Sequence, residues 1–430
     1  MREEEELQLA LLSCLLLKHR QRKSEKVKKK RKVWVKEIFL HRKTKGAYHQ
    51  LVQELRITDR ESHFRYLRMS PERFDHLLSL VGPLIKKQDT KFREAITPGE
   101  RLALTLRFLA SGDSQVSLAF QFRVGDKSVS RILSETSLAI WRVLQPIYVS
   151  PPTKPGEWRR IAIDFEDLWQ LPHVVGAIDG KHIAMEAPSR SGSLFFNHKG
   201  FFSHVLMAVC DARYGFSLVD VGQYGSSNDS GVLANSEFGC QLESGTAGLP
   251  EPEIKKGYNN GPLPYYLVGD AIFALQPWLM RPYCGKLTEE QAAFNYRLSR
   301  CRRVIENTFG ILSARWRIFS RPIKASVDNI ERYTQAAICL HNYLRQTENA
   351  LYCPSGFIDS ENGSGEIKRG EWRSIVGDEE SGCFRSINRC KGGKRKQDAN
   401  KMREALKQYV NSDEGALPWQ LSYVRRTGNE

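Results

Sequence analysis

The spacing of apolar residues changes along the chain near residue 150. Before that point apolar residues recur every three or four positions, as in Phe74, Leu77 and Leu78, which is the spacing of an amphipathic helix. Beyond it, apolar residues stand in short continuous runs that polar or Gly-rich segments separate, which is typical of buried strands. These runs cover residues 174–178, 204–210, 216–221 and 265–268. The pattern predicts an all-helical part followed by an α/β part.

The clearest helical signals lie within residues 96–150. Thr97-Pro98-Gly99-Glu100 predicts a capping box with proline at the first helical position, and Gly112 predicts the helix end. We expect a second helix over residues 114–122, a turn at 123–125, and a third helix that starts at Asp126. The first turns of this third helix carry the polar and basic residues Lys127, Ser128, Ser130 and Arg131, whereas Val129, Ile132 and Leu133 face inward. This layout is typical of a DNA-binding helix-turn-helix, although structural bundles share it.

The strand runs predict the fold of the second part, which follows a Pro-rich connection at residues 150–155. Three strands, a helical segment at 230–242, a fourth strand and further helices follow the order of a ribonuclease-H-like fold. In that order Asp179 ends the first strand, Asp270 ends the fourth, and Glu306 projects from a later helix. We therefore expect these three carboxylates to meet at one edge of the sheet.

Converging carboxylates make a hard, oxygen-rich site that suits Mg²⁺ or Mn²⁺. Two such ions can activate a water molecule and stabilise the leaving oxygen of a phosphodiester. Asp229 is a fourth candidate, but Asn-Asp-Ser before a predicted helix is also good N-cap sequence, which needs no chemistry. The acidic residues thus predict a metal-dependent nuclease.

Composition favours a nucleic-acid partner. The formal net charge is +16 and the pI is near 9.4, so the surface attracts polyanions through counterion release; a ribosome-like or membrane-surface binder is the alternative. Residues 18–32 contain ten Lys or Arg out of fifteen, which predicts a nuclear-import signal or a DNA-backbone arm, or else a solvated tail. The nine cysteines contain no Cys-x-x-Cys pair, which argues against a zinc knuckle and a disulfide framework. The apolar run at 7–17 is too short to span a membrane.

Five sequence fragments resemble those of a known family. They are Ala-Ile-Asp-Gly-Lys-His, Phe-Asn-His-Lys-Gly-Phe-Phe-Ser-His, Gly-Ser-Ser-Asn-Asp-Ser, Leu-Val-Gly-Asp and Arg-Arg-Val-Ile-Glu-Asn-Thr-Phe-Gly-Ile-Leu. In this order and spacing they resemble the PIF/Harbinger transposases and the Harbinger transposase-derived nucleases, over roughly residues 100–345.

The resemblance implies a DDE-type endonuclease whose metal ligands are Asp179, Asp229, Asp270 and Glu306. Related insertion-sequence enzymes often carry a Tyr, Arg, Glu, Lys series on the last catalytic helix. Here Arg302 and Glu306 fit that series, while Ser299 and Ser313 depart from it, which puts transposition in doubt. The family also implies a Myb/SANT-like DNA-binding partner protein. Residues expected to contact DNA near the site are Lys181, Lys199, Arg302 and Arg303.

These observations predict five segments. They are a basic N-terminal arm (1–32), a helical lead-in (33–95), a helix-turn-helix region (96–150), a ribonuclease-H-like DDE nuclease domain (151–346), and a polar extension with one short helix (347–430). We expect a nuclear protein that binds DNA and no membrane, with the cytoplasm and the oligomeric state left open. The competing hypothesis is a domesticated DNA-binding or scaffold protein without catalytic activity.

Overall fold

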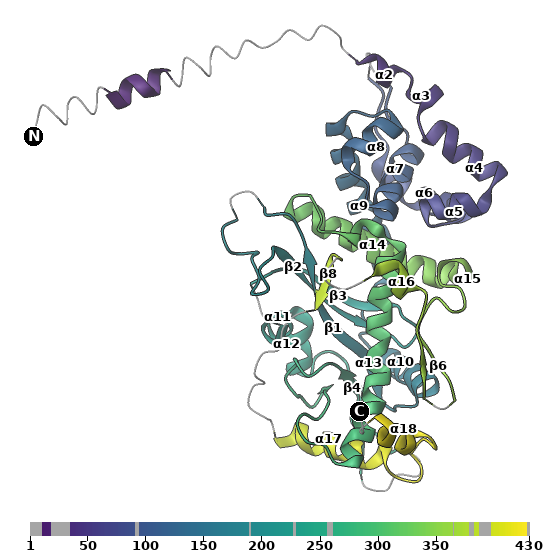
Figure 1. Cartoon of the computed structure of the whole chain (residues 1–430), viewed down its shortest axis with the longest axis vertical. Helices are drawn as coiled ribbons and strands as arrows, with labels where there is room; N and C mark the ends of the chain where they lie inside the picture. Colours follow the sequence, from purple (N-terminus) through teal and green to yellow (C-terminus); the bar gives the residue numbers. More distant parts are fainter. Residues whose placement is uncertain are drawn as a thin grey trace, which may run out of the picture.

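The computed structural model shows a mixed α/β protein, as the sequence predicts (Figure 1). It describes residues 11–18, 35–90, 94–188, 191–226, 229–255, 261–363, 365–377, 382–386 and 397–427. Most of the predicted basic arm therefore lies outside the described residues. Within these ranges no helix is long and apolar enough to cross a membrane. All eight cysteines that lie in them are free thiols, and Cys390 lies outside.

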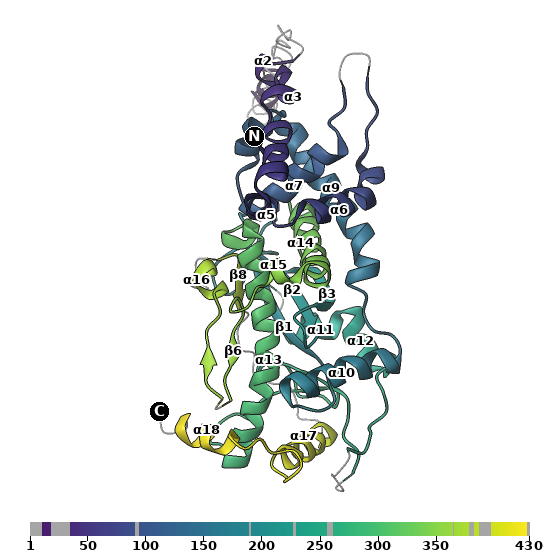
Figure 2. The same cartoon turned by 90° about the vertical axis from the view of Figure 1, so that its right-hand side faces the viewer.

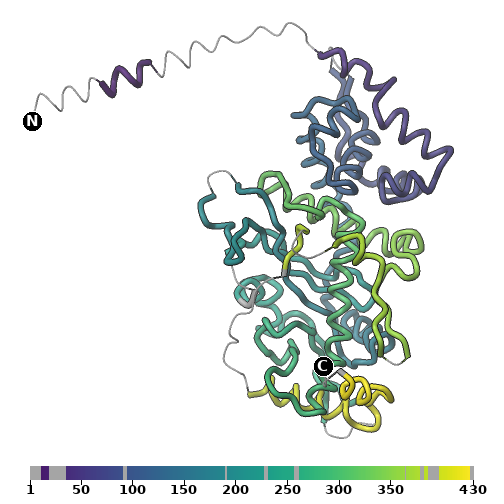
Figure 3. The backbone as a smooth tube through the Cα atoms, viewed as in Figure 1, coloured from purple at the N-terminus to yellow at the C-terminus, as the bar shows by residue number. Residues whose placement is uncertain are grey.

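Short helices form one end of the molecule, seen in purple and blue in Figures 1 and 3. They are α2 (Glu37–Leu40), α3 (Arg42–Lys45), the π-helix η1 (Tyr48–Val52), α4 (Gln53–Thr58), α5 (Arg60–Leu67), α6 (Pro71–Ile85), α7 (Pro98–Ser111), α8 (Gln115–Phe122) and α9 (Asp126–Tyr148). The predicted signals fix α7: the Thr97 hydroxyl accepts the Glu100 N–H at 3.3 Å, and Gly112 ends the helix at φ 68°.

The second half of the predicted capping box does not form. The Glu100 carboxylate is buried, and it faces Arg42 Nε at 3.6 Å and His49 Nε2 at 3.7 Å rather than the backbone of Thr97. The sequence pattern cannot reveal this because Arg42 and His49 come from α3 and η1, more than fifty residues earlier. Tertiary packing thus overrides the local capping preference.

Helix α8 matches the predicted 114–122 with Ser114 as its N-cap, and α9 starts at Asp126 as predicted. Val129, Ile132 and Leu133 of α9 are buried, while Lys127 and Arg131 are exposed. Helix α9 is 23 residues long and extends to the connection that leads into the α/β part, and Arg332 of α14 donates to its Ser134 (Figure 1). The helical end therefore packs against the second part through α9 and α14 (Val327–Thr347).

A mixed sheet lies at the centre of the α/β part. Its strands are β1 (Val174–Ala184), β2 (Ser203–Cys210), β3 (Phe216–Tyr224), β4 (Tyr266–Val268), β5 (Leu279–Met280) and β8 (Phe384–Ser386). The order is β3-β2-β1-β4-β5, with β8 paired to β1. Strands β1, β2 and β3 are antiparallel, whereas β4 and β5 run parallel to β1.

Strand β1 is longer than predicted. Asp179 was expected to end it at the Asp-Gly step, but the strand continues to Ala184. It does so because the pairing with β2 continues from Asp179↔Ala208 to Ala184↔Ser203, and β8 pairs with the same stretch on the other side. The parallel neighbour β4 is the strand that stops near Asp179, since its last pair with β1 is Ala177↔Val268. A sheet edge thus opens beside the middle of β1.

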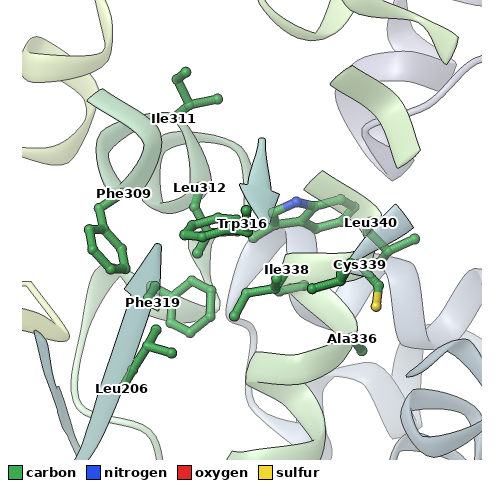
Figure 4. Close-up of a cluster of buried hydrophobic side chains, with 14 of the residues drawn as sticks. Leu206, Phe309, Ile311, Leu312, Trp316, Phe319, Ala336, Ile338, Cys339 and Leu340 are labelled. Carbon is green, nitrogen blue, oxygen red and sulfur yellow. The ribbon is translucent and has the colours of Figure 1, made fainter. Parts of the chain in front are cut away.

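Helices cover the sheet on two sides (Figure 2). One side carries α10 (Pro155–Trp169), which the sequence did not predict, with α11 (Asp229–Asn235) and α12 (Glu237–Glu243). The other carries α13 (Glu289–Arg315), the 3₁₀-helix η2 (Arg317–Ser320) and α14. Figure 4 shows the core on this side, where Trp316 lies among apolar residues of the sheet and helices. The burial of this core holds α13 against the sheet.

The C-terminal extension contains more secondary structure than the one short helix that its sequence predicts. It contains α15 (Asn349–Tyr352), β6 (Ser360–Glu361), β7 (Ile367–Lys368), α16 (Trp372–Val376), β8, α17 (Gln397–Val410) and α18 (Gln420–Thr427). Strand β8 joins the main sheet, and α16, α17 and α18 pack on α13 (Figure 1). Isolated apolar residues such as Trp372 and Phe384 make these contacts, and isolated residues leave no periodic signal in a sequence.

Candidate active site

Three of the four predicted acidic residues line one pocket of about 310 Å³. Asp179 comes from the middle of β1, Asp270 follows the end of β4, and Glu306 comes from α13. Lys181 and Arg302 line the same pocket. Residues that are more than 120 positions apart in the sequence therefore meet where β4 stops beside β1.

Strand alternation places Asp179 and Lys181 together. They are two residues apart on β1 and so share a face of the sheet, which is the face covered by α13. Lys181 Nζ lies 3.3 Å from Asp179 Oδ2, and the Gly180 N–H donates to Asp179 Oδ1 at 3.0 Å. Both side chains are mostly buried. The pair gives the pocket one anchored carboxylate with a cation beside it.

Asp270 is held by the turn after β4. The Ile272 N–H donates to Asp270 Oδ1 at 2.9 Å. A Cβ atom at Gly269 would lie 2.9 Å from Phe273 and 3.2 Å from Ile178, so glycine allows this turn to approach β1 closely. Burial raises the pKa of Asp270, and the Asp179 carboxylate raises it further. The Ile272 N–H, Arg302 and Lys181 act in the opposite direction and lower it. Two carboxylates thus face one low-dielectric pocket.

Glu306 lies on α13 one turn after Arg302 and pairs with it. Burial alone would lower the pKa of the Arg302 guanidinium, but Glu306 and the two aspartates, Asp179 and Asp270, raise it. The negative charges of three carboxylates thus act on Arg302. It orients Glu306 while its own charge stays inside the pocket.

The donor atoms suit a hard divalent cation, because carboxylate oxygens are the ligands that Mg²⁺ and Mn²⁺ prefer. The mutual repulsion of Asp179 and Asp270 is what such a cation would relieve. Nevertheless, the described residues contain no group of three or more His, Cys, Asp or Glu side chains close enough to hold a metal ion. Glu306 pairs with Arg302 and does not complete such a group.

Not every predicted site residue reaches this pocket. Asp229 is the first residue of α11, and its side chain lies outside the described part of the structure. Arg303 is mostly buried against Glu361, 3.5 Å away, on another face of α13. Lys199 is exposed in the turn that precedes β2, where its N–H donates to Asn197 Oδ1. Lys127, Ser128, Ser130 and Arg131 lie on α9, in the helical end of the molecule (Figure 1).

The neighbouring histidine of β1 is structural. His182 is completely buried, its Nδ1 lies 3.0 Å from the Ser203 hydroxyl, and Asn197 donates to the same hydroxyl at 2.9 Å. Burial, with His198 and Lys199 nearby, lowers the pKa of His182 to about 4. Its neutral ring therefore braces the turn before β2, and it is absent from the residues that line the pocket.

The sequence pattern does not reveal the residues that the C-terminal extension brings to the pocket. Trp372 and Arg373 of α16 and Phe384 of β8 line it together with the three acids. The only sequence signal was the presence of large aromatic residues in an otherwise polar segment. Such residues mark a segment that docks on the rest of the protein, but they do not tell where it docks.

Comparison with known proteins supports a nuclease of the DDE superfamily. Residues 178–342, which include Asp179, Asp270 and Glu306, match the family model described as DDE superfamily endonuclease. "Protein ALP1-like" of Arabidopsis thaliana is 30% identical over 314 residues, which cover 68% of this chain and 72% of that protein. "Putative nuclease HARBI1" of Homo sapiens is 26% identical over 303 residues, which cover 69% and 82%. No solved structure matches the chain significantly.

The chain therefore belongs to the Harbinger transposase-derived nucleases of the DDE superfamily, as its sequence fragments indicate.

Proposed function

We propose that this protein is a divalent-metal-dependent DNA endonuclease of the DDE transposase type, with a ribonuclease-H-like catalytic domain. The observation that carries the proposal is the convergence of Asp179, Asp270 and Glu306 on one pocket at the edge of the sheet. The strand order β3-β2-β1-β4-β5, with three antiparallel strands followed by two parallel ones, supports the fold assignment. The family model covers all three residues.

In this proposal Asp179, Asp270 and Glu306, together with Asp229, hold Mg²⁺ or Mn²⁺. The bound ions would supply an activated water and charge neutralisation at the leaving oxygen. Lys181 and Arg302 act on the substrate itself: each places a positive charge in the pocket, where a scissile phosphate can be attracted and oriented. Arg302 also has to release Glu306 in part, because the two side chains are paired here.

DNA binding is assigned to the helical end. Helices α7, α8 and α9 are proposed as a helix-turn-helix in which α9 enters the major groove. Lys127 and Arg131 are exposed on its first two turns, and Ser128 and Ser130 are partly exposed beside them, so all four side chains can reach DNA. Near the pocket, exposed Lys199 can contact the DNA backbone. A nuclear location and a Myb/SANT-like partner complete the proposal.

The same site could also carry out strand transfer, and the proposal leaves open whether it does. A water molecule and a 3′ hydroxyl attack a phosphodiester by the same in-line displacement, so one set of carboxylates serves both reactions. Ser313, which stands where related enzymes carry lysine, lines the pocket and donates to the Phe309 carbonyl on its own helix. A substrate contact that the lysine would supply is therefore missing from this helix.

A plasmid-nicking assay with Mg²⁺ or Mn²⁺ tests the function. We expect the parent protein to nick, and Asp179→Asn, Asp270→Asn and Glu306→Gln each to lower the rate by about 100-fold or more, the scale on which single active-site groups act. Glu290→Gln is the matched control, because Glu290 lies exposed on the first turn of the same helix. Its rate should equal that of the parent.

A different result would favour the domesticated binding protein. In that case DNA affinity, measured by anisotropy, would be normal, no divalent metal would support nicking, and the three site variants would behave like the parent. If instead the parent nicks and Glu306→Gln nicks equally fast, the protein is a nuclease but this pocket is not its active site. A 3′-end joining assay on the same samples separates hydrolysis from strand transfer.

A further inference from the structure

Part of the C-terminal extension is built around the turn of α13 that carries Glu306. The family model ends at residue 342, so this extension lies beyond the matched region. Nevertheless, Trp372 of the extension lines the same pocket as Glu306. Its indole Nε1–H donates to Asn307 Oδ1 at 2.7 Å, and Asn307 is the residue next to Glu306.

The indole lies against α13 at Gly310. A Cβ atom at Gly310 would lie 2.4 Å from Trp372 Cε3 and 2.5 Å from Cδ2, a separation that real Cβ atoms do not adopt. Only glycine therefore lets the ring approach the helix this closely. Gly310 follows Glu306 by four residues, so the ring covers the next turn on the Glu306 face of the helix.

Trp372 is itself held in place by the neighbouring Arg373. The Arg373 guanidinium lies 4.4 Å from the centroid of the indole ring. Arg373 in turn binds the Asp359 carboxylate through Nε at 2.9 Å and through Nη2 at 2.5 Å. The Asp359 side chain is almost completely buried and accepts the Gly370 N–H at 2.8 Å. An ion pair between the partly exposed Arg373 and the buried Asp359 thus supports the tryptophan ring, which restricts its motion.

These contacts place fixed groups one turn before and one turn after Glu306 on its face of α13. Helical side chains tilt toward the N-terminus, which directs Glu306 toward Arg302 one turn before it, and the two are paired. On the C-terminal side the Trp372 ring fills the space over Gly310. A free glutamate samples many rotamers, and restricting them places its carboxylate in the pocket before the substrate arrives.

We propose that Trp372 is a positioning residue for the Glu306 carboxylate, so that α16 of the extension, with Asp359 behind it, is a working part of the active site. This rests on the proposed nuclease function, in which Glu306 holds a metal ion. The indole acts by restricting the rotamers of Glu306 and by fixing Asn307, without touching the substrate.

The test compares two tryptophans of the same extension. Trp419 is, like Trp372, partly buried, and its Nε1–H donates to Tyr296 of the same helix at 3.0 Å, but Tyr296 precedes Glu306 by ten residues. We expect Trp372→Ala to lower the single-turnover nicking rate by about 10- to 100-fold, the scale of a small misplacement of a catalytic group, with an unchanged DNA Kd. Trp372→Phe keeps a ring over Gly310 and should recover most of the rate. Trp419→Ala should leave the rate unchanged.

A melting experiment checks the Gly310 contact without relying on activity. Gly310→Ala should lower the Tm of the parent, because the new methyl group meets the indole, and should lower it much less in the Trp372→Ala background. Additive Tm changes would show that the ring does not press on this turn and would overturn the proposal.

Two activity outcomes would also overturn it. One is an equal effect of Trp372→Ala and Trp419→Ala on the rate, which would mean general stabilisation. The other is a Trp372→Ala defect that lies wholly in the DNA Kd, which would mean substrate binding. If the parent itself fails to nick, the nuclease function is wrong and this proposal falls with it; the parent sample alone reveals that case.

Discussion

Helix α13 uses the same residue type in two different ways on two of its faces. Arg297, Arg300 and Arg303 are almost fully buried and bind other parts of the chain. Arg302 lies on the pocket face, about one-third exposed, and pairs with Glu306. The difference shows that burial and partners, and not the sequence of basic residues, decide which arginine is available to a substrate phosphate.

The buried arginine face of α13 holds the C-terminal extension through hydrogen bonds. Arg297 donates to the Gly415 carbonyl at 2.7 Å and to Gln420 Oε1 at 3.0 Å. Arg300 donates to Glu361 at 2.8 Å and to Gln170 Oε1 at 2.8 Å. These arginines stabilise the fold through these bonds, although the buried Arg297 Nε has no acceptor among the described residues.

Removing Arg297 should have the largest effect on stability. Arg297→Met keeps most of the side-chain volume but leaves the Gly415 carbonyl and Gln420 Oε1 without their donor. We therefore expect a loss of about 3 kcal/mol in the free energy of unfolding. Urea denaturation measures it. Arg159→Met, at an exposed ion pair with Glu253, should change little. Equal losses in both variants would contradict the assigned role of the buried face.

Helical periodicity could place these arginines on a helix but could not assign their faces. Arg302 and Glu306 fit the helix series of related enzymes, and the structure pairs them. Arg303 was expected near DNA, whereas the structure places it against Glu361. Its partner belongs to a polar segment 58 residues later, and nothing local to Arg303 indicates that contact.

Two buried glutamates differ in whether their carboxylates accept hydrogen bonds. Glu361 accepts hydrogen bonds from Arg300 and from the Tyr296 hydroxyl. The Glu100 carboxylate is equally buried, but neither oxygen has a hydrogen-bond partner in the described structure. Burial raises the pKa of Glu100 to about 7, against the opposing effect of Arg42.

The contribution of Glu100 to the free energy of unfolding should therefore fall as the pH rises. A carboxyl whose folded pKa lies above its unfolded value stabilises the fold fully below the unfolded value, and this contribution is lost as the pH rises through the folded pKa. Between pH 5 and 8 we expect the parent to lose about 2 kcal/mol relative to Glu100→Gln, which carries no titrating group there. Urea denaturation across this range tests it, and parallel pH curves for the two proteins would refute it.

Arg303→Gln tests whether the neighbour of Arg302 is structural. The variant removes one of two cations from the buried Glu361, so we expect a loss of about 1.5 kcal/mol in the free energy of unfolding. The nicking rate per folded molecule should not change, because Arg303 does not line the pocket. A rate loss at unchanged stability would place Arg303 at the substrate after all.

Arg302→Gln should show the opposite pattern. Glu306 loses its partner and the pocket loses a cation, so we expect the nicking rate to fall about tenfold, which corresponds to about 1.4 kcal/mol in the activation barrier. The Tm should stay near that of the parent, since an ion pair that is one-third exposed contributes little. If the two variants exchange these phenotypes, the comparison between the faces is wrong.

The candidate site was predictable to the extent that its residues stand at the ends of apolar runs. Asp179 and Asp270 follow such runs, and the strand order brings them together. The exact end of β1 was not predictable, because the pairing with β2 and β8 prolongs the strand beyond its apolar core. Trp372 was out of reach for a similar reason: a single aromatic residue in a polar segment has no period.

The smallest effect is expected at the exposed start of the same helix. Glu289 lies on the first turn of α13 and pairs with Arg425 of α18 at 2.5 Å, with about half of the glutamate side chain and two-thirds of the arginine exposed. Water and salt screen such a pair, so Glu289→Gln should leave both the Tm and the nicking rate unchanged. A clear drop in Tm would mean that α18 is held on α13 by exposed charges as well as by the buried Arg297 face, and the contrast between buried and exposed arginine contacts would then weaken.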